Sequence, residues 1–237
     1  MGGLRLVVLW CVAFAHTVGC TTPVFRTQLY GSVILRCTFP FLLKDTSAEV
    51  VWEIEREGAR TLAYKKVRGQ QEEVWPPYTG RVRFVGTWQH LNIEISNVTS
   101  ADEGVYFCRC LNTKGHGDKQ VRLEITGVNA GDPMIGLIYV GGYKRLQCTW
   151  TGDLRDTKMW WYDANGRLIN VVKSTQRVAK VERGLTMVSS VLDLEINVNH
   201  HYFCRTSEGK FKKVTRGVLS DGSPVKIHDV EFEDATK

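Results

Sequence analysis

The sequence predicts an all-β protein that consists of two antiparallel β-sandwiches in tandem, and three observations lead to this fold class. Short runs alternate between apolar and polar residues, as in "SVILRC", "LNIEISNV", "QVRLEI" and "VLDLEI". Gly, Asn, Asp and Pro separate these runs, and no long helical periodicity competes with them. One spacing of cysteine, tryptophan and tyrosine occurs twice. Short alternating strands between turn residues are typical of an antiparallel sandwich.

The N-terminus has the layout of a secretory signal peptide. Arg5 precedes an apolar run from Leu6 to Ala15, and small residues follow at Gly19 and Cys20. The run is shorter than the roughly 20 apolar residues of a membrane-spanning helix. We therefore predict a signal peptide over residues 1–20 and a secreted mature chain, or the soluble form of a membrane protein.

The repeated spacing defines two domains. The first set is Cys37, Trp52, Tyr106 and Cys108, and the second is Cys148, Trp161, Tyr202 and Cys204. The cysteines lie 71 positions apart in the first set and 56 in the second. This is the framework of an immunoglobulin domain, in which a disulfide joins the two sheets, the tryptophan packs on it and the tyrosine hydroxyl bonds to nearby backbone.

The two intervals also distinguish the domain types. The longer one leaves room for the additional strands of a variable-type domain, and the shorter one suits a constant-type domain. The Gly-, Asn- and Pro-rich stretch "TGVNAGDP" marks the junction. We predict a variable-type domain over residues 21–126, a constant-type domain over 127–220 and a polar tail without strand pattern over 221–237.

Cys110 follows Cys108 in a Cys-x-Cys pair. A metal site would need two further ligands nearby, and the chain has no second Cys-x-Cys or Cys-x-x-Cys pair. If signal peptidase cuts after Gly19, Cys20 remains and can form a disulfide with Cys110. If it cuts after Cys20, Cys110 is either a free thiol or the bridge of a covalent homodimer. The sequence leaves these alternatives open.

Three other residues are expected to have modification or structural roles. Asn97 begins the only Asn-x-Ser/Thr sequon and precedes a turn, so we expect it to carry a glycan. Arg81 and Asp102 are expected to form the ion pair that closes the base of a variable-type domain, with Arg83 as the alternative to Arg81.

Nothing in the sequence indicates an enzyme, a cofactor or a metal. There is no nucleophile elbow, zinc-protease motif or phosphate loop. His200 and His201 are adjacent, so on a strand they point to opposite faces. The net charge of +6 is modest, and no aromatic residues interleave with basic ones as nucleic-acid binding requires.

Parts of both domains resemble one family. "YTGRVRF" and "LNIEISNVTSADEGVYFC" resemble the D-to-F segment of the variable domains of butyrophilins and related co-stimulatory or co-inhibitory ligands. "WYDANGRLI" and "GLTMVSSVLDLEI" resemble their second domain, although "CTWTGDLRD" departs from the usual Trp/Tyr-Pro step and Cys110 is extra. The resemblance implies a ligand that binds a leukocyte receptor and modulates T-cell activation.

The resemblance also implies that the partner docks on the front sheet of the variable domain. Because Cys108 points inward, Phe107 and Arg109 should point outward. Phe107 and Leu111 are expected to be apolar anchors, and Arg109 a charge-assisted contact. The full expected set is Glu53, Tyr64, Phe107, Arg109, Leu111, Gln120 and Arg122. The alternatives are a soluble homophilic or heterophilic adhesion module, and a secreted protein that binds polyanions through its basic strands. Two basic clusters mark these strands: Lys173, Arg177, Lys180 and Arg183, and Lys210, Lys212, Lys213 and Arg216.

Overall fold

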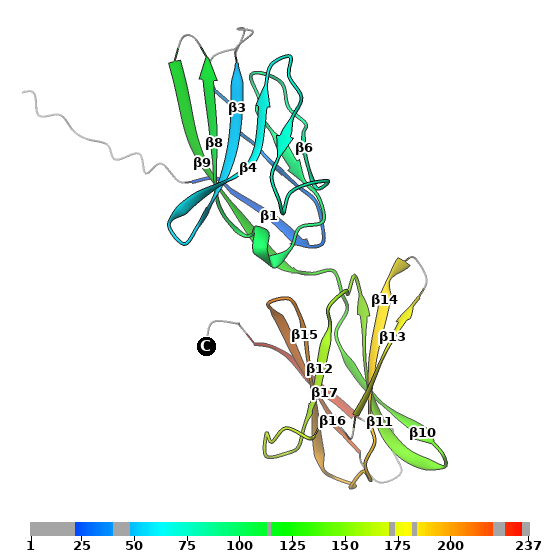
Figure 1. The fold of residues 1–237 in the computed structure, drawn as a ribbon. Coiled ribbons are helices and arrows are strands. Elements are labelled where there is room, and N and C mark those ends of the chain that lie inside the picture. The colour runs from blue at the N-terminus through cyan, green and yellow to red at the C-terminus, as the bar shows by residue number, and fades with distance from the viewer. Residues whose placement is uncertain are drawn as a thin grey trace, which may run out of the picture.

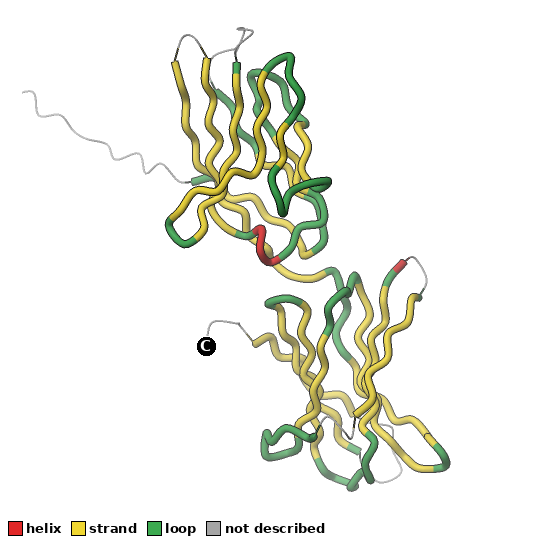
Figure 2. The backbone as a smooth tube through the Cα atoms, in the orientation of Figure 1, coloured by secondary structure: helices red, strands yellow, loops and turns green. Residues whose placement is uncertain are grey.

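The computed structural model describes residues 22–39, 48–112, 115–170, 174–181, 184–219 and 226–233. They form two β-sandwiches that follow one another along the chain (Figure 1), and strands and loops make up almost all of them (Figure 2). The prediction of an all-β fold is therefore confirmed. The predicted signal peptide, with Cys20, lies outside the described residues.

The variable-type domain has a front sheet of six strands in the order β1-β9-β8-β3-β4-β5. β1 pairs with β9 in parallel and the other neighbours are antiparallel. The back sheet has the order β2-β7-β6. The front strands are β1 (Val24–Leu29), β3 (Glu49–Arg56), β4 (Ala59–Val67), β5 (Glu73–Val74), β8 (Gly104–Asn112) and β9 (Gly115–Val128); the back strands are β2 (Val33–Leu35), β6 (Val82–Phe84) and β7 (Ile93–Ile95).

The second sandwich, which we call the constant-type domain after the sequence prediction, has two sheets of four strands, in the orders β10-β11-β14-β13 and β12-β15-β16-β17. Successive strands along the chain run up and down between the two ends of this domain (Figure 1). The strands are β10 (Met134–Val140), β11 (Tyr143–Gly152), β12 (Lys158–Tyr162), β13 (Ser174–Lys180), β14 (Thr186–Leu192), β15 (His201–Glu208), β16 (Phe211–Val218) and β17 (Lys226–Glu233).

Strand β17 lies where the sequence predicted a polar tail, so the prediction of a tail without strands was wrong for residues 226–233. β17 pairs antiparallel with β16, from Val218 opposite Lys226 to Lys212 opposite Glu233. The register shifts between Val214 and Arg216. Such a bulge adds a residue to one strand, which breaks the period-two alternation of its sequence. The broken alternation and the many acidic residues concealed the strand.

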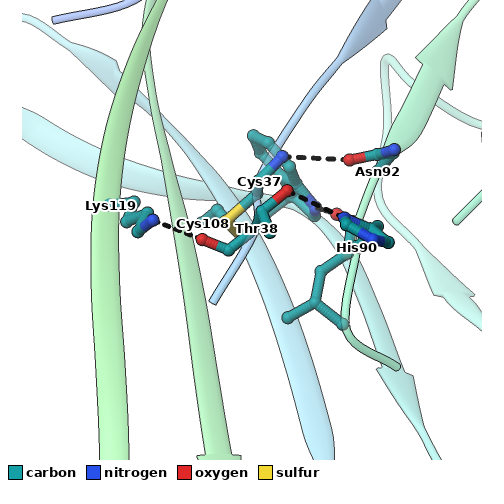
Figure 3. Close-up of a disulfide and its surroundings, with 8 residues drawn as sticks. Cys37, Thr38, His90, Asn92, Cys108 and Lys119 are labelled. Atoms are coloured by element: carbon teal, nitrogen blue, oxygen red, sulfur yellow. Dashed lines mark hydrogen bonds between the residues drawn. A yellow bond between two sulfur atoms is a disulfide. The ribbon is translucent and has the colours of Figure 1, made fainter. Parts of the chain in front are cut away.

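Both framework disulfides, Cys37–Cys108 and Cys148–Cys204, join the sheets of their domains. Asn92 lies beside the first one, where its Oδ1 accepts a hydrogen bond from the Cys37 amide at 3.0 Å (Figure 3). The framework tryptophans are buried. The indole nitrogens donate at 3.0 Å, that of Trp52 to the Leu91 carbonyl and that of Trp161 to the Ser190 hydroxyl.

The tyrosine and ion-pair positions behave as structural elements. Tyr106 donates its hydroxyl proton to the Asp102 carbonyl at 2.7 Å, and the Tyr202 hydroxyl accepts from the Asn197 amide at 3.2 Å. Arg81, not Arg83, makes the ion pair with Asp102. Its Nη1 and Nη2 lie 2.7 and 3.0 Å from the two carboxylate oxygens. Arg83 instead pairs with Glu94 on the back sheet.

A buried carboxylate, that of Glu208, connects the two domains. It accepts hydrogen bonds from the Tyr30 hydroxyl of the variable-type domain and from the backbone amides of Arg155 and Asp156, the latter two at 3.1 and 2.9 Å. The Thr157 hydroxyl is a fourth donor. The Arg155 guanidinium also lies 4.2 Å from the centre of the Tyr30 ring. We refer to Tyr30, Glu208 and residues 155–157 as the elbow.

Candidate functional site

The outer face of the front sheet carries two rows of side chains from four neighbouring strands. Successive residues of a strand point to opposite faces, so the cross-strand partner of an outward residue also points outward. Read from β9 to β4, the rows are Asp118, Arg109, Val51 and Lys65, and Gln120, Phe107, Glu53 and Leu62.

Arg60 reaches across these rows from β4. Its guanidinium lies over the Phe107 ring, 3.5 Å from the ring centre, and its Nη1 is 3.2 Å from an Asp118 carboxylate oxygen. The same nitrogen is 3.9 Å from Glu53 Oε2, which accepts a hydrogen bond from Arg109 at 3.0 Å. We call Glu53, Arg60, Phe107, Arg109 and Asp118 the front-sheet cluster.

The charges of the front-sheet cluster contribute little to stability. The side chains of Arg60, Arg109 and Asp118 are more than one-third exposed. Exposed ion pairs of this kind are worth about 0–1 kcal/mol. The cluster therefore presents donors and acceptors in a fixed pattern to solvent without being needed for the fold.

Two of the predicted contact residues are buried and not available to a partner. Phe107 points outward but is only 8% exposed, because Arg60 covers its ring. Tyr64 is fully buried and stacks on Phe84 in the core. The β3–β4 register shifts between Trp52 and Glu53, which changes the face to which Tyr64 points. Phe107 is thus not a free anchor, and Tyr64 is not a surface residue.

The other predicted residues lie on the surface. Glu53 and Arg109 belong to the front-sheet cluster, and Gln120 and Arg122 are exposed on β9. Leu111 is 40% exposed near the end of β8. The surface thus combines a central charged cluster with an apolar side chain at its rim.

Sequence reasoning missed Arg60, Asp118 and the exposed Trp75, which follows β5. Asp118 is the cross-strand partner of Arg109, so counting the register of the β8–β9 hairpin would have found it. Arg60 had no comparable signal. It lies on β4, whereas its contacts Phe107 and Asp118 lie on β8 and β9, beyond the neighbouring strand β3. Trp75 is placed beside β4 by the hydrogen bond from its amide to the Ala63 carbonyl at 3.2 Å.

Cys110 points into the core of the variable-type domain and is fully buried. Burial raises the pKa of its thiol. A Cβ atom at Gly117 would lie 2.3 Å from the Phe39 ring and 3.2 Å from Cys110 Sγ, so glycine is required there. A bridge to a second chain would need the sulfur to leave the core.

Thiol labelling is expected to distinguish the states of Cys110. With a free buried thiol, iodoacetamide modifies Cys110 slowly in the native protein and rapidly in denaturant without reductant, because thiolate formation and access both require opening. A Cys20–Cys110 disulfide would instead block alkylation in denaturant until reductant is added. Peptide mapping by mass spectrometry reads out both results.

The sequon asparagine lies next to the elbow. Asn97 is exposed, and its Oδ1 accepts a hydrogen bond from Arg155 of the constant-type domain at 2.5 Å. N-glycosylation modifies the side-chain nitrogen, so a glycan is compatible with this contact. Glycosylation of Asn97 remains a prediction.

The second basic cluster, Lys210, Lys212, Lys213 and Arg216, does not form one surface. Lys210 pairs with Glu103 across the domain boundary. Lys213 is buried and donates to the Asp132 carboxylate at 2.7 Å and the Gly131 carbonyl at 3.1 Å. Polyanions need several exposed cations close together, and these two lysines already have acidic partners.

Within the described ranges, no helix has the length and hydropathy needed to cross a membrane. The same residues contain no group of three or more His, Cys, Asp or Glu side chains placed to hold a metal ion.

Residues 21–126 match the immunoglobulin V-set domain family. Human T-lymphocyte activation antigen CD80 is 27% identical over 169 residues, which are 69% of this chain and 56% of that protein. Human butyrophilin subfamily 2 member A2 is 25% identical over 74% of this chain and 34% of its own length. Human V-set domain-containing T-cell activation inhibitor 1 is 23% identical over 95% of this chain and 80% of its own length.

Among solved structures, a crystal structure of bovine butyrophilin matches with 18% identity and a TM-score of 0.42, covering 85% of this chain and 95% of that one. The chain thus spans about half and one-third of the length of the first two curated relatives. Residues 21–126 thus form an immunoglobulin V-set domain, and these relatives and the two disulfide frameworks support a butyrophilin-like member of the immunoglobulin superfamily.

Proposed function

We propose that this chain is a secreted or cell-surface ligand that binds a protein receptor on leukocytes through the front sheet and thereby modulates lymphocyte activation. The names of two relatives refer to T-cell activation and to its inhibition. The observation that carries the proposal is the front-sheet cluster on the open face of the variable-type domain.

The composition of this face suits protein recognition. Arginine and aromatic side chains are enriched at the centres of protein interfaces, where they contribute most of the binding energy. Arg60 and Arg109 lie at the centre, and Leu111 is at the rim. Because Glu53 and Asp118 alternate with the arginines, the cluster presents both signs of charge, which fixes the orientation of a partner. Recognition of this kind involves no covalent chemistry.

Leukocyte staining tests this proposal. The mature chain is expected to stain resting or activated leukocytes saturably. Arg109→Glu is expected to weaken the apparent affinity by about tenfold or more, because it removes the guanidinium from the front-sheet cluster and places a like charge beside Glu53. Arg83→Glu is the matched control, since Arg83 makes the same kind of arginine–glutamate pair on the back sheet. Flow cytometry over a concentration series measures both.

Three other results would point elsewhere. If Arg109→Glu and Arg83→Glu weaken the apparent affinity for leukocytes equally, the front sheet is not the binding surface. Staining that disappears with moderate salt and with Lys212→Glu would favour polyanion binding. Absence of staining together with self-association in light scattering would favour a homophilic adhesion module.

A further inference from the structure

The backbone of Asn97 is held at the end of the variable-type domain that faces the constant-type domain. Asn97 precedes the short helix η1 (Ser100–Asp102), the red segment between the two domains in Figure 2. Its φ of 52° is left-handed, a conformation that asparagine tolerates better than most residues. Its carbonyl accepts a hydrogen bond from Arg81 at 3.0 Å, and the buried Asp102 holds Arg81 in turn. The sequon therefore has a defined position at the domain boundary.

The side chain of Asn97 is held by the other domain. Its Oδ1 accepts a hydrogen bond from Nη1 of Arg155 at 2.5 Å. A guanidinium has only donors, so the amide oxygen must face Arg155 and Nδ2 occupies the other branch of the planar amide. Because Asn97 is exposed, Nδ2 can carry a glycan while Oδ1 keeps its donor.

Arg155 is itself fixed by several contacts. Its backbone amide donates to Glu208 at 3.1 Å. Its guanidinium lies 4.2 Å from the centre of the Tyr30 ring, and its Nε is 3.6 Å from an Asp153 carboxylate oxygen. Hydrogen bonds from a charged donor are also stronger than those between neutral groups. The Asn97 amide therefore has a defined orientation relative to the constant-type domain.

This contact determines where a sugar on Asn97 begins. The oxygen and nitrogen of a planar amide are about 2.2 Å apart, and Oδ1 is 2.5 Å from Arg155 Nη1. Nδ2 is thus no more than about 5 Å from the guanidinium of the other domain. The first sugar of an N-linked glycan, N-acetylglucosamine, has hydroxyl and acetamido groups that both donate and accept hydrogen bonds. The Arg155 guanidinium and the Asp153 carboxylate offer it a donor and an acceptor.

We propose that Asn97 carries an N-linked glycan whose first sugar lies against Asp153 and Arg155 and thereby restrains the elbow. The sugar is covalently attached to the variable-type domain and bound non-covalently by the constant-type domain. It forms a link between the domains that the polypeptide alone does not make. This inference does not rest on the proposed receptor.

The other contacts across the domain boundary explain why such a link matters. Domains of one chain move relative to one another unless their interface is large and apolar. The contacts at this boundary include the Tyr30–Glu208 hydrogen bond and the Lys210–Glu103 ion pair, in which water can replace either partner. A sugar that bridges the boundary therefore narrows the range of domain orientations. Since Asn97 follows β7 of the back sheet, the glycan leaves the front sheet accessible.

Three forms of the full mature chain test the proposal. Animal cells that make only mannose-rich glycans supply the glycosylated chain, endoglycosidase H trims it to the first sugar, and a bacterial periplasm supplies the same chain with Asn97 unmodified. The backbone amides of Arg155 and Asp156 are expected to exchange hydrogen for deuterium about threefold faster in the unmodified chain than in either glycosylated form. Small-angle X-ray scattering should show a broader range of domain orientations in the unmodified chain only.

Two variants provide matched controls. Arg155→Ala removes the group that receives the sugar, so it should abolish the difference between the glycosylated and unmodified chains. Arg167→Thr combined with Asn97→Gln moves the sequon to Asn165, in an exposed turn after β12. Since β12 starts beside the elbow and runs away from it, a glycan on Asn165 should leave the exchange of the Arg155 and Asp156 amides unchanged. Circular dichroism verifies that the variants are folded.

Four results would each overturn the proposal. The first is the absence of a sugar on Asn97 in peptide maps of the chain from animal cells. The second is equal exchange and scattering in all three forms. The third is a glycan effect that persists in Arg155→Ala, and the fourth is the same effect from a glycan on Asn165. None of these measurements involves leukocyte staining, so the receptor proposal stands or fails separately.

Discussion

Replacing Asp102 with alanine is expected to lower the free energy of unfolding of the variable-type domain by about 3–5 kcal/mol, the usual cost of removing one partner of a buried ion pair. Asp102 is fully buried, and its carboxylate accepts two hydrogen bonds from Arg81 and two from the amide and hydroxyl of Thr99. The alanine variant leaves all four donors without this acceptor. Urea unfolding followed by tryptophan fluorescence measures the change.

The pH dependence provides a second test of the same pair. Burial alone would raise the pKa of Asp102, but hydrogen bonds from Arg81 and Thr99 outweigh burial and hold it below its usual value. The unfolded value is about 3.9, so the stabilisation is complete above that pH and is lost as the pH falls through the folded pKa. The difference between the natural protein and Asp102→Ala should therefore shrink on acidification below about pH 4.

A control variant separates this pair from general damage. Arg83→Ala removes an arginine that is exposed and paired with Glu94, and it should cost less than about 1 kcal/mol. If Asp102→Ala costs no more than Arg83→Ala, the buried pair does not stabilise the domain as described.

The framework could be predicted because it depends on residues whose spacing is visible in the chain. A disulfide across two sheets, a tryptophan on it and a tyrosine before the second cysteine recur at characteristic intervals, and the structure places Cys37, Trp52 and Tyr106 accordingly. Alternation likewise predicted that Phe107 and Arg109 point away from the core.

What sequence reasoning missed depends on register. The irregularity between Trp52 and Glu53 buries Tyr64, and a second irregularity adds a residue to β17 opposite Val214–Arg216. A register shift of one residue reverses the face of every following side chain, and no local sequence pattern reveals such a shift. Arg60 covers Phe107 for a related reason, since a long side chain contacts residues several strands away.

The elbow is the other feature that no local pattern revealed. Tyr30 and Glu208 are 178 positions apart, and neither belongs to the framework. Burial and the Glu208 carboxylate raise the pKa of Tyr30 above its usual value, so its hydroxyl remains a neutral donor well into the alkaline range. The pair becomes visible only when the two domains are placed together.

Replacing Glu208 with alanine is expected to lower the free energy of unfolding by about 3 kcal/mol. The variant removes a buried acceptor and leaves its four hydrogen-bond donors without a partner. Three of these donors, the amides of Arg155 and Asp156 and the Thr157 hydroxyl, lie within the constant-type domain. Only Tyr30 reaches it from the other domain. The alanine variant should therefore destabilise the constant-type domain and also loosen the elbow, which calorimetry and small-angle X-ray scattering measure respectively.

Tyr30→Phe separates these two effects. It removes only the hydrogen bond between the domains, so its cost in stability should be about 1 kcal/mol, while the scattering profile should shift towards a broader range of domain orientations. The Phe side chain keeps the ring that Arg155 contacts, so any change reports the hydroxyl alone. If Tyr30→Phe leaves the scattering unchanged while Glu208→Ala broadens it, then residues 155–157 hold the domain orientation through their loop conformation, and the Tyr30–Glu208 hydrogen bond does not.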